Sequence, residues 1–537
     1  MLDQPARESS RILDPRKRIA SSALLVMSLL AVGKVVGVID DLVKARVFGT
    51  SADLDAFVAA GGLPELLNTV ISGGALAAPF IPVLSQYLSR GDRTGGLRLI
   101  SSVINAAFLT TAVLAVTAGV FSPWIVEHVI ASGFSPSLQA LTAGLMRVTL
   151  LSTIVFSVSG VVMSVLHAYQ HFLLPALAPI LYNVGIIAGA VFLAPRWGVW
   201  GLALGALGGS VMHLLIQVPG LLRYGVRWLP VLNLKDPGMK QVLLLMGPRV
   251  LTLAVVQLNT LILVRMASQL TTGSVSALNY GWRLMQMPET IIGTAIATAV
   301  FPALSGMAAQ GNMRQLNNTL SAALRAVLVM GIPAALGLVL MGRSVIALLF
   351  RGGQFGAASA DAVFAAMSGF AVGLVGYAAV EVAARGFFAR RDTKTPLVVS
   401  VVGLVFMVVC SLALRGPLGH GGLALASSLG IVVEFALLLW LTDDTVGGLD
   451  KRRLFGTGWR AALAAAIMGA ALSGWKVWWP YSDSDLFCLA VFLSGGVVLG
   501  AVVYLAAGWI LGMEEVRALG HLVARRGIRM LPIRDKV

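Results

Sequence analysis

The sequence KVVGVIDDLVKARVFGTSADLDAF (residues 34–57), continued by VAAGGLPELLNTVISGGALAAPFIPVLSQYLSR (residues 58–90), places many charges inside apolar sequence of membrane length. The charged residues within or at the ends of its two apolar spans are Lys34, Asp40, Asp41, Lys44, Arg46, Asp53, Asp55 and Glu65. An ion held in lipid at the centre of a bilayer costs roughly 2.5 to 3.5 kcal/mol on insertion scales. We therefore expect these side chains to face one another or a wet cavity.

Glycines and prolines interrupt the second of these spans. They are Gly61, Gly62, Pro64, Gly73, Gly74, Pro79 and Pro82. Backbone groups freed at a bend are tolerated in a membrane where they line a cavity rather than lipid. The pattern predicts a bent helix, and a transporter whose site involves the first two helices.

The composition predicts an all-α polytopic membrane protein. The chain has 537 residues, of which 57% are hydrophobic and only 12% charged, too few polar residues to cover a soluble globule of this size. Apolar runs of about 20 residues or more predict about 14 transmembrane helices. The net charge of +16 is carried mainly by short gaps between these runs, which favours a role in topology over nucleic-acid binding.

The sequence contains no pattern typical of an enzyme or of a metal site. Cys410 and Cys488 lie in separate apolar runs and predict neither a disulfide framework nor a metal cluster. We find no Walker loop and no nucleophile triad, so we expect no catalytic residues, no ATP consumption and no cofactor. A monovalent cation or a proton is the hypothesis for the coupling ion.

The distribution of basic residues predicts the orientation of the chain. Gaps assigned to the inside are rich in Lys and Arg, whereas gaps 124–136 and 479–485 contain none. An even number of spans returns the chain to the side where it started. We therefore expect both termini to be cytoplasmic, with a retained first helix behind the basic lead rather than a cleaved signal peptide.

Similar segments recur at a nearly constant spacing, which indicates an internal repeat. The matched pairs are Pro64 and Pro288 (224 residues apart), Pro82 and Pro302 (220), Pro175 and Pro396 (221), and Gly201 and Gly422 (221). Six spans in each copy predict two lobes in parallel orientation. The predicted divisions are a cytoplasmic lead (1–19), an N-lobe (20–225), a C-lobe (226–445), two extra spans (446–512) and a basic cytoplasmic tail (513–537).

Several motifs resemble the MurJ/MviN family of lipid II flippases, in the multidrug/oligosaccharidyl-lipid/polysaccharide exporter superfamily. They are GKVVGVIDDLVKARVFGTSADLDAF, LPELLNTVISGGALAAPFIPVLSQY, HAYQHFLLPALAPILYN, GSVSALNYGWRLMQMPETIIGTAIATAVFPALS and GFFARRDTKTP. The resemblance implies alternating-access export of a lipid-linked saccharide, the undecaprenyl-pyrophosphate-linked peptidoglycan precursor, across the bacterial cytoplasmic membrane. It also implies that the two extra helices form a groove for the polyprenyl tail, and that membrane lipids and cell-wall synthesis enzymes are partners.

The chain departs from the family in the cations of its cavity. Asp40 stands where members usually carry an arginine before an aspartate, and Asn68 and Thr69 stand where they carry one or two arginines. The family's Glu-Gly step in the second span is Gly73 and Gly74 here. The loss of cavity arginines weakens the site expected for a pyrophosphate.

The residues predicted to contact substrate are Lys34, Asp41, Asp55 and Arg283. By the resemblance, Arg283 matches a cavity arginine, Lys34 replaces an earlier one, and the two aspartates match family aspartates. A guanidinium suits a bidentate phosphate contact. The alternatives are an ion pair of Arg283 with Glu289 or with an acid of the N-lobe, which would hold the two lobes together, and pairing of an aspartate on the first span with Lys34 or Lys44.

Asp40, Glu65 and Glu289 are predicted as cavity acids or coupling groups. Glu65 and Glu289 each follow a proline at related positions of the two copies, so two acids facing one cavity could bind a cation or a proton. The alternative is that each caps a kinked helix after its proline.

Three other functions stay open from the sequence. Within the same superfamily, the chain could export another polyprenyl-linked glycan or a small cationic compound, which an acidic cavity would suit. From a different class, it could be a non-transporting membrane scaffold for cell-wall enzymes, in which all charges would pair off.

Overall fold

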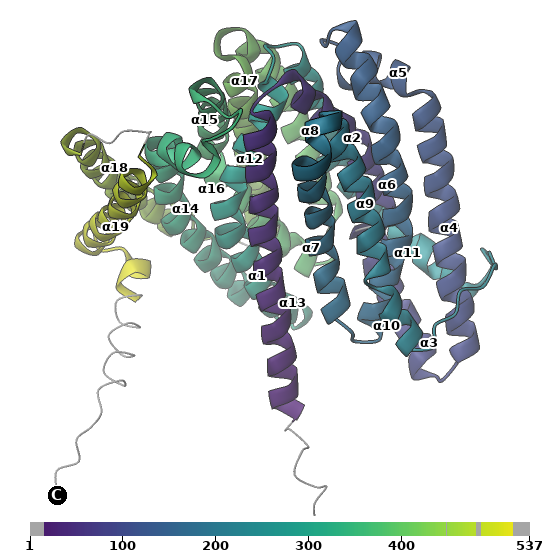
Figure 1. Cartoon of the computed structure of the whole chain (residues 1–537). Coiled ribbons are helices and arrows are strands. Elements are labelled where there is room, and N and C mark those ends of the chain that lie inside the picture. Colours follow the sequence, from purple (N-terminus) through teal and green to yellow (C-terminus); the bar gives the residue numbers. More distant parts are fainter. Residues whose placement is uncertain (1–14, 73, 447, 480–484, 519–537) are drawn as a thin grey trace, which may run out of the picture. The chain divides into compact units, whose positions relative to one another are not determined.

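The computed structural model describes residues 15–72, 74–446, 448–479 and 485–518, which form helices joined by short loops (Figure 1). Within these ranges the one β-type pairing outside helices is an isolated bridge between Gly352 and Phe355. The predicted all-α class is confirmed. Helices are expected here because a membrane-spanning segment must satisfy its own backbone hydrogen bonds.

The chain forms two compact units. Unit 1 contains α1 up to Val47 and the stretch Ala56–Leu261, and unit 2 contains Phe48–Asp55 and the chain from Ile262 onward. Helix α11 (Pro237–Ser268) therefore begins in unit 1 and ends in unit 2. The five-part division drawn from the sequence stays a prediction.

Unit 1 is built from long helices with short π-helical and helical turns between them. Apart from Phe48–Asp55, where α1 ends and α2 begins, its elements before α11 are α1 (Pro15–Phe48), α2 (Ala52–Leu67), η1 (Asn68–Ser72), α3 (Gly74–Ser89), α4 (Arg93–Val120), α5 (Ser122–Ile125), η2 (Val126–Ile130), α6 (Pro136–Ala168), α7 (Leu173–Ala188), η3 (Gly189–Leu193), α8 (Ala194–Trp197), α9 (Trp200–Leu215) and α10 (Val218–Arg223).

Glycines bring α7, η3 and α9 into direct backbone contact. A Cβ on Gly205 would lie 2.7 Å from the carbonyl oxygen of Gly185, and one on Gly209 would lie 2.5 Å from that of Tyr182. Small residues at four-residue spacing let helices approach closely in a membrane, where dispersion rather than the hydrophobic effect holds them together.

Unit 2 repeats this design and adds two helices. Its elements after α11 are α12 (Ser274–Glu289), η4 (Thr290–Thr294), α13 (Ala295–Ala309), α14 (Met313–Phe350), α15 (Ala357–Val372), α16 (Leu374–Ala389), α17 (Lys394–Val446), α18 (Lys451–Trp478) and α19 (Leu486–Ile510). The last two pack on α14 through a core that includes Met341, Leu472 and Phe492. The Tyr504 hydroxyl closes this contact by donating to the Val329 carbonyl at 2.7 Å.

The spans agree with the predicted number. Eleven helices of the described residues are long and apolar enough to cross a membrane, and the pair α15 and α16, bent by 44°, makes twelve. Helix α17 has 53 residues with a non-helical Gly419 inside, so it holds two spans. With α1 taken as the first span, as the sequence predicts, the described helices are roughly consistent with the predicted number of about fourteen.

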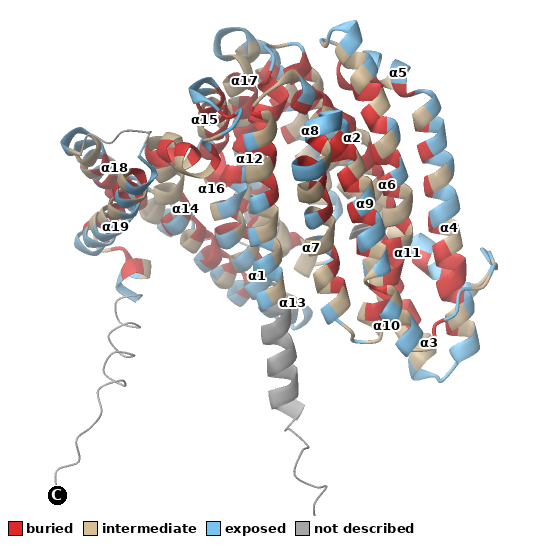
Figure 2. Ribbon diagram, in the orientation of Figure 1, coloured by how far each residue is buried: buried red, intermediate tan, exposed pale blue. Residues whose placement is uncertain are grey.

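Many large apolar residues of these helices are exposed. Figure 2 shows exposed residues in pale blue along the helices. Examples on α4 are Phe108, Val113 and Val116. A soluble protein rarely exposes such continuous apolar surface, because water would contact it. The pattern is that of a multi-pass membrane protein.

The internal repeat is confirmed by the backbone itself. Positions of unusual positive φ recur at the predicted spacing, and they are Gly91 (71°) with Gly311 (70°), Gln170 (58°) with Arg391 (63°), and Gly198 (55°) with Gly419 (56°). Gly198 and Gly419 also share a ψ of −137°. Conformations this rare do not coincide by chance at separations of 220 and 221 residues.

The glycine pair provides a test of the repeat. A Cβ at this φ and ψ is strained by about 1–3 kcal/mol, so Gly198→Ala and Gly419→Ala should each lower the thermal unfolding midpoint of the purified protein. Gly416→Ala is the matched control, because its added Cβ also meets open space but its φ is not in the left-handed region. Equal midpoints for all three variants would contradict the equivalence.

Candidate functional site

Two aspartates and a lysine form a buried ion cluster on α1. Lys44 Nζ lies 2.8 Å from Asp40 Oδ2 and 3.0 Å from Asp41 Oδ1, and all three residues are under a tenth exposed. Spacings of three and four residues place the lysine beside both acids on one helix face. Of the two lysines considered for pairing with the aspartates, the structure selects Lys44.

Lys34 lies apart from this cluster, seven residues before Asp41 on the same helix. Its side chain is exposed, and among the described residues no acid lies within ion-pair distance of it. The exposed ammonium group of Lys34 can therefore contact an anionic ligand. Its predicted substrate contact stays a prediction.

Asp55 caps the N-terminus of α12. Its two oxygens accept from the backbone N–H groups of Gly273 at 2.6 Å and Ser276 at 2.7 Å. The carboxylate is 2% exposed, and it satisfies two N–H groups that a helix start leaves without an internal partner. The geometry therefore favours a structural role for Asp55 over the predicted substrate contact.

Arg283 is exposed on α12, where its Nε donates to Asn279 Oδ1 at 3.2 Å. The asparagine precedes it by one helical turn and orients the guanidinium. Neighbouring Trp282 packs edge-on against Phe370 and Tyr377, with ring centroids 5.3 and 5.0 Å away, and holds this part of α12 in place. An oriented and accessible guanidinium is suited to an anionic group.

The acids Glu65 and Glu289 do not match in register. Helices α2 and α12 both have 16 residues, and the five-residue π turns that follow them, Asn68–Ser72 and Thr290–Thr294, are offset by 222 residues. Glu289 then corresponds to Leu67, two residues beyond Glu65, and two residues rotate a helix by about 200°. Glu65 is accordingly exposed and Glu289 buried, which corrects the predicted pairing.

Unit 2 contains two acids in apolar surroundings, Glu289 and Glu434. Glu289 is buried, and Glu434 Oε1 accepts from Ser400 Oγ at 3.0 Å. Glu434 is not among the site residues predicted from the sequence. Its neighbours come from distant parts of the chain, so no local signal could have found them.

A neutral pair occupies the position where the family resemblance leads one to expect arginines. Gln257 Nε2 donates to Thr69 Oγ1 at 2.8 Å, joining α11 to the π turn η1. A neutral hydrogen bond lets η1 pack against α11 without a buried charge. Position 69 of unit 1 therefore carries a neutral side chain in place of the expected arginine.

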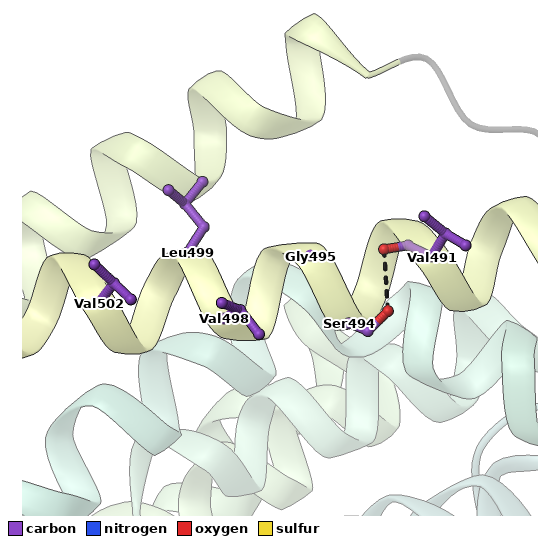
Figure 3. A pocket seen from close by; sticks show the side chains of 6 residues that line it. All are labelled: Val491, Ser494, Gly495, Val498, Leu499 and Val502. Atoms are coloured by element: carbon purple, nitrogen blue, oxygen red, sulfur yellow. Dashed lines mark hydrogen bonds between the residues drawn. The ribbon is translucent and has the colours of Figure 1, made fainter.

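The outer face of α19 carries a shallow apolar depression (Figure 3). Its volume is about 550 Å³, and it is lined by Val491, Ser494, Gly495, Val498, Leu499 and Val502. The Ser494 hydroxyl donates to the Ala490 and Val491 carbonyls of its own helix. Its hydrogen-bond donor is therefore satisfied without a partner on this surface. An acyl or prenyl chain is the chemistry that such a surface accepts.

The described part of the chain holds no metal-ligand cluster. Among the described ranges, no three His, Cys, Asp or Glu side chains are grouped as ligands would be. The coupling ion stays a prediction.

The α1 cluster predicts a large difference between two lysine variants. Lys44→Met removes the cation that contacts both buried carboxylates, and breaking such a pair costs about 3–5 kcal/mol. We expect low yield and a lowered unfolding midpoint, largely restored in Asp40→Asn/Asp41→Asn/Lys44→Met. Lys34→Met is the control at an exposed position, and equal stability of both lysine variants would contradict the assignment.

Because Asp55 caps α12, we expect its substitution to lower the stability of the protein rather than to remove a substrate contact. Asp55→Ala should lower the free energy of unfolding by about 1–3 kcal/mol for each buried N–H that loses its acceptor. Asp53→Ala, an exposed acid in the same helical turn, should leave the midpoint nearly unchanged. If Asp55→Ala melted normally but lost all transport, the substrate contact would be the correct interpretation.

Comparison with known proteins places the chain in a family. The family model described as "Lipid II flippase MurJ" matches residues 44–513. The lipid II flippase MurJ of Burkholderia cenocepacia is 31% identical over 509 residues, covering 91% of this chain and 97% of that protein. The probable lipid II flippase MurJ of Vibrio cholerae is 30% identical over 518 residues, with 93% and 97% covered.

Solved structures agree on the fold. A lipid II flippase MurJ in an inward closed conformation matches with a TM-score of 0.77 at 24% identity, covering 91% of this chain and 98% of that one. An inward-facing MATE family transporter of the MOP superfamily matches with a TM-score of 0.64 at 15% identity, covering 81% and 98%. On the family model and the full-length relatives, this chain belongs to the lipid II flippase MurJ family.

Proposed function

We propose that this protein is a flippase that moves lipid II, the undecaprenyl-pyrophosphate-linked peptidoglycan precursor, from the inner to the outer leaflet of the bacterial cytoplasmic membrane. The observation that carries the proposal is the match to family members along almost their whole length. The proposed activity is transport, with no covalent step. Both termini lie in the cytoplasm in this proposal, because the basic gaps face inward.

The chemistry of the substrate requires cations in the transport path. A pyrophosphate in a low-dielectric cavity is stable only beside positive charge. Arg283 and Lys34 are both accessible, whereas Lys44 is committed to Asp40 and Asp41. Arg283 is therefore the residue on which the pyrophosphate contact depends most.

Alternating access and an ion gradient complete the proposal. Of the three acids predicted for coupling, the buried Asp40 and Glu289 are the ones proposed to carry a monovalent cation or a proton, and no nucleotide motif points to ATP. The apolar face of α19 is suited to the polyprenyl tail. Cell-wall synthesis enzymes are the expected protein partners.

A second candidate is export of a small cationic compound. It is favoured by the α1 cluster, in which two aspartates share one lysine, and by the neutral Thr69 and Gln257 pair. Under this alternative the acids rather than Arg283 would contact the substrate.

Variants of Arg283 decide between the two. In a bacterium depleted of its own flippase, this protein should restore growth and the exposure of lipid II on the outer leaflet. Arg283→Ala should abolish both at normal protein abundance, and Arg283→Lys should restore them in part because the bidentate geometry is lost. Arg314→Ala, an exposed arginine in the first turn of α14, is the matched control.

The opposite pattern would reject lipid II as the substrate. If Arg283→Ala transported normally while Glu289→Gln or Asp40→Asn failed, the pyrophosphate contact would be wrong. Loss of drug efflux in those acid variants would then support the cationic substrate.

A further inference from the structure

The segment between α10 and α11 is not helical and lies against α4. We call residues 224–236 the linker strap. In Figure 1 it is the teal segment that runs beside the lower half of α4. It joins the sixth span to the seventh, and therefore one repeat to the next.

Three polar side chains of α4 hold the backbone of the strap. Ser101 Oγ accepts from the Leu229 N–H at 3.0 Å, and Ser102 Oγ accepts from the Asn233 N–H at 3.1 Å. Asn105 Nδ2 donates to the carbonyls of residues 229 and 231 at 3.1 and 2.9 Å. Four backbone groups of the strap thus find on α4 the hydrogen bonds that they would make with solvent in a loop exposed to water.

Ring stacking and hydrogen bonds also hold both ends of the strap. The Tyr224 ring stacks on Tyr169 with centroids 4.7 Å apart, and Arg93 Nη2 donates to the Tyr224 carbonyl at 3.3 Å. At the other end, Asp236 Oδ1 accepts from the Tyr87 hydroxyl at 3.2 Å and from the Gly238 N–H at 2.9 Å, where it caps α11.

The outward face of the strap is apolar. Trp228, Leu232 and Leu234 are 62%, 46% and 51% exposed. The indole N–H of Trp228 nevertheless donates inward to Asn105 Oδ1 at 2.9 Å, which leaves only the carbon surface of the ring facing out. An aromatic ring with an internally satisfied N–H is suited to contact with lipid.

The position of α4 sets the depth of the strap. Ser101 and Asn105 follow the first residue of α4, Arg93, by 8 and 12 residues, which is about 12 to 18 Å along the helix axis. The sequence from residue 99 onward is largely apolar and is part of a membrane span. Irregular backbone is stable beside lipid only where protein groups replace water, as these three side chains do.

Basic side chains frame the apolar face. Arg223, Arg227 and Lys235 are all exposed and lie at or beside the two ends of the strap. Apolar side chains flanked by cations are the pattern of a segment that enters the headgroup region of an anionic leaflet.

We propose that the linker strap is a binding site for anionic phospholipid, in which Trp228, Leu232 and Leu234 enter the acyl region and the flanking basic residues contact the phosphates. The strap thereby fixes the connection between the repeats to the leaflet. This proposal goes beyond the transported substrate and holds whether that substrate is lipid II or a cation.

The first test measures the depth of the strap. In full-length protein with Cys410→Ala and Cys488→Ala, a bimane fluorophore on Leu232→Cys should be strongly quenched in phosphatidylglycerol vesicles with brominated acyl chains. The same fluorophore on Thr94→Cys, an exposed site in the first turn of α4, should be quenched far less. Equal quenching at the two positions would overturn the proposal.

The second test measures the headgroup contact with phosphatidylglycerol added to purified protein that is free of polyprenyl lipids. Because each basic residue near an anionic surface contributes to affinity, a strap triple variant should bind up to about a hundredfold more weakly. A control triple variant on α18 changes the charge equally and should bind normally. The two are Arg223→Gln/Arg227→Gln/Lys235→Gln and Lys451→Gln/Arg452→Gln/Arg453→Gln. Equal loss in both, or in neither, would reject the site.

Discussion

The lack of water inside a bilayer is the constraint on which this structure depends, because every polar group at that depth needs a partner within the protein. Lys44 is the partner of Asp40 and Asp41, with which it forms an ion cluster inside one helix. Asp55 is the partner of two backbone N–H groups at the start of α12. On α4, Ser101, Ser102 and Asn105 do the same for the linker strap. In each case a polar residue in apolar sequence has a structural task, which must be recognised before a functional one is assigned.

The internal repeat places the same backbone features in both copies. Both copies break their second helix with a five-residue π turn after 16 residues, and both place glycine at the same strained conformation, Gly198 and Gly419. What differs between the copies is the chemistry on this scaffold. The first copy has a neutral Thr69 where the family resemblance leads one to expect arginine, whereas the second has Arg283 with its orienting Asn279. This asymmetry concentrates the proposed anion contact in one unit.

Three functions are assigned to separate surfaces. Arg283 is the group proposed for the pyrophosphate, the apolar face of α19 is proposed for the polyprenyl chain, and the linker strap is proposed for the surrounding phospholipid. A transported lipid presents a charged headgroup and an apolar chain, which need a polar contact and an apolar surface, and the protein also needs a stable contact with the leaflet around it.

The sequence by itself determined the helical class, the number of spans and the repeat, because these depend on apolar runs and spacings that lie along the chain. Spacing along the first helix predicted that an aspartate pairs with Lys34 or Lys44, and the structure shows that Lys44 contacts both aspartates. Tertiary structure alone decided that Asp55 caps a helix some 220 residues away, that Glu289 is buried while Glu65 is exposed, and that the linker strap lies on α4. These features could not be predicted, since a hydrogen-bond partner distant in sequence leaves no periodic trace, and a shift of two residues in a repeat reverses the face that a side chain presents.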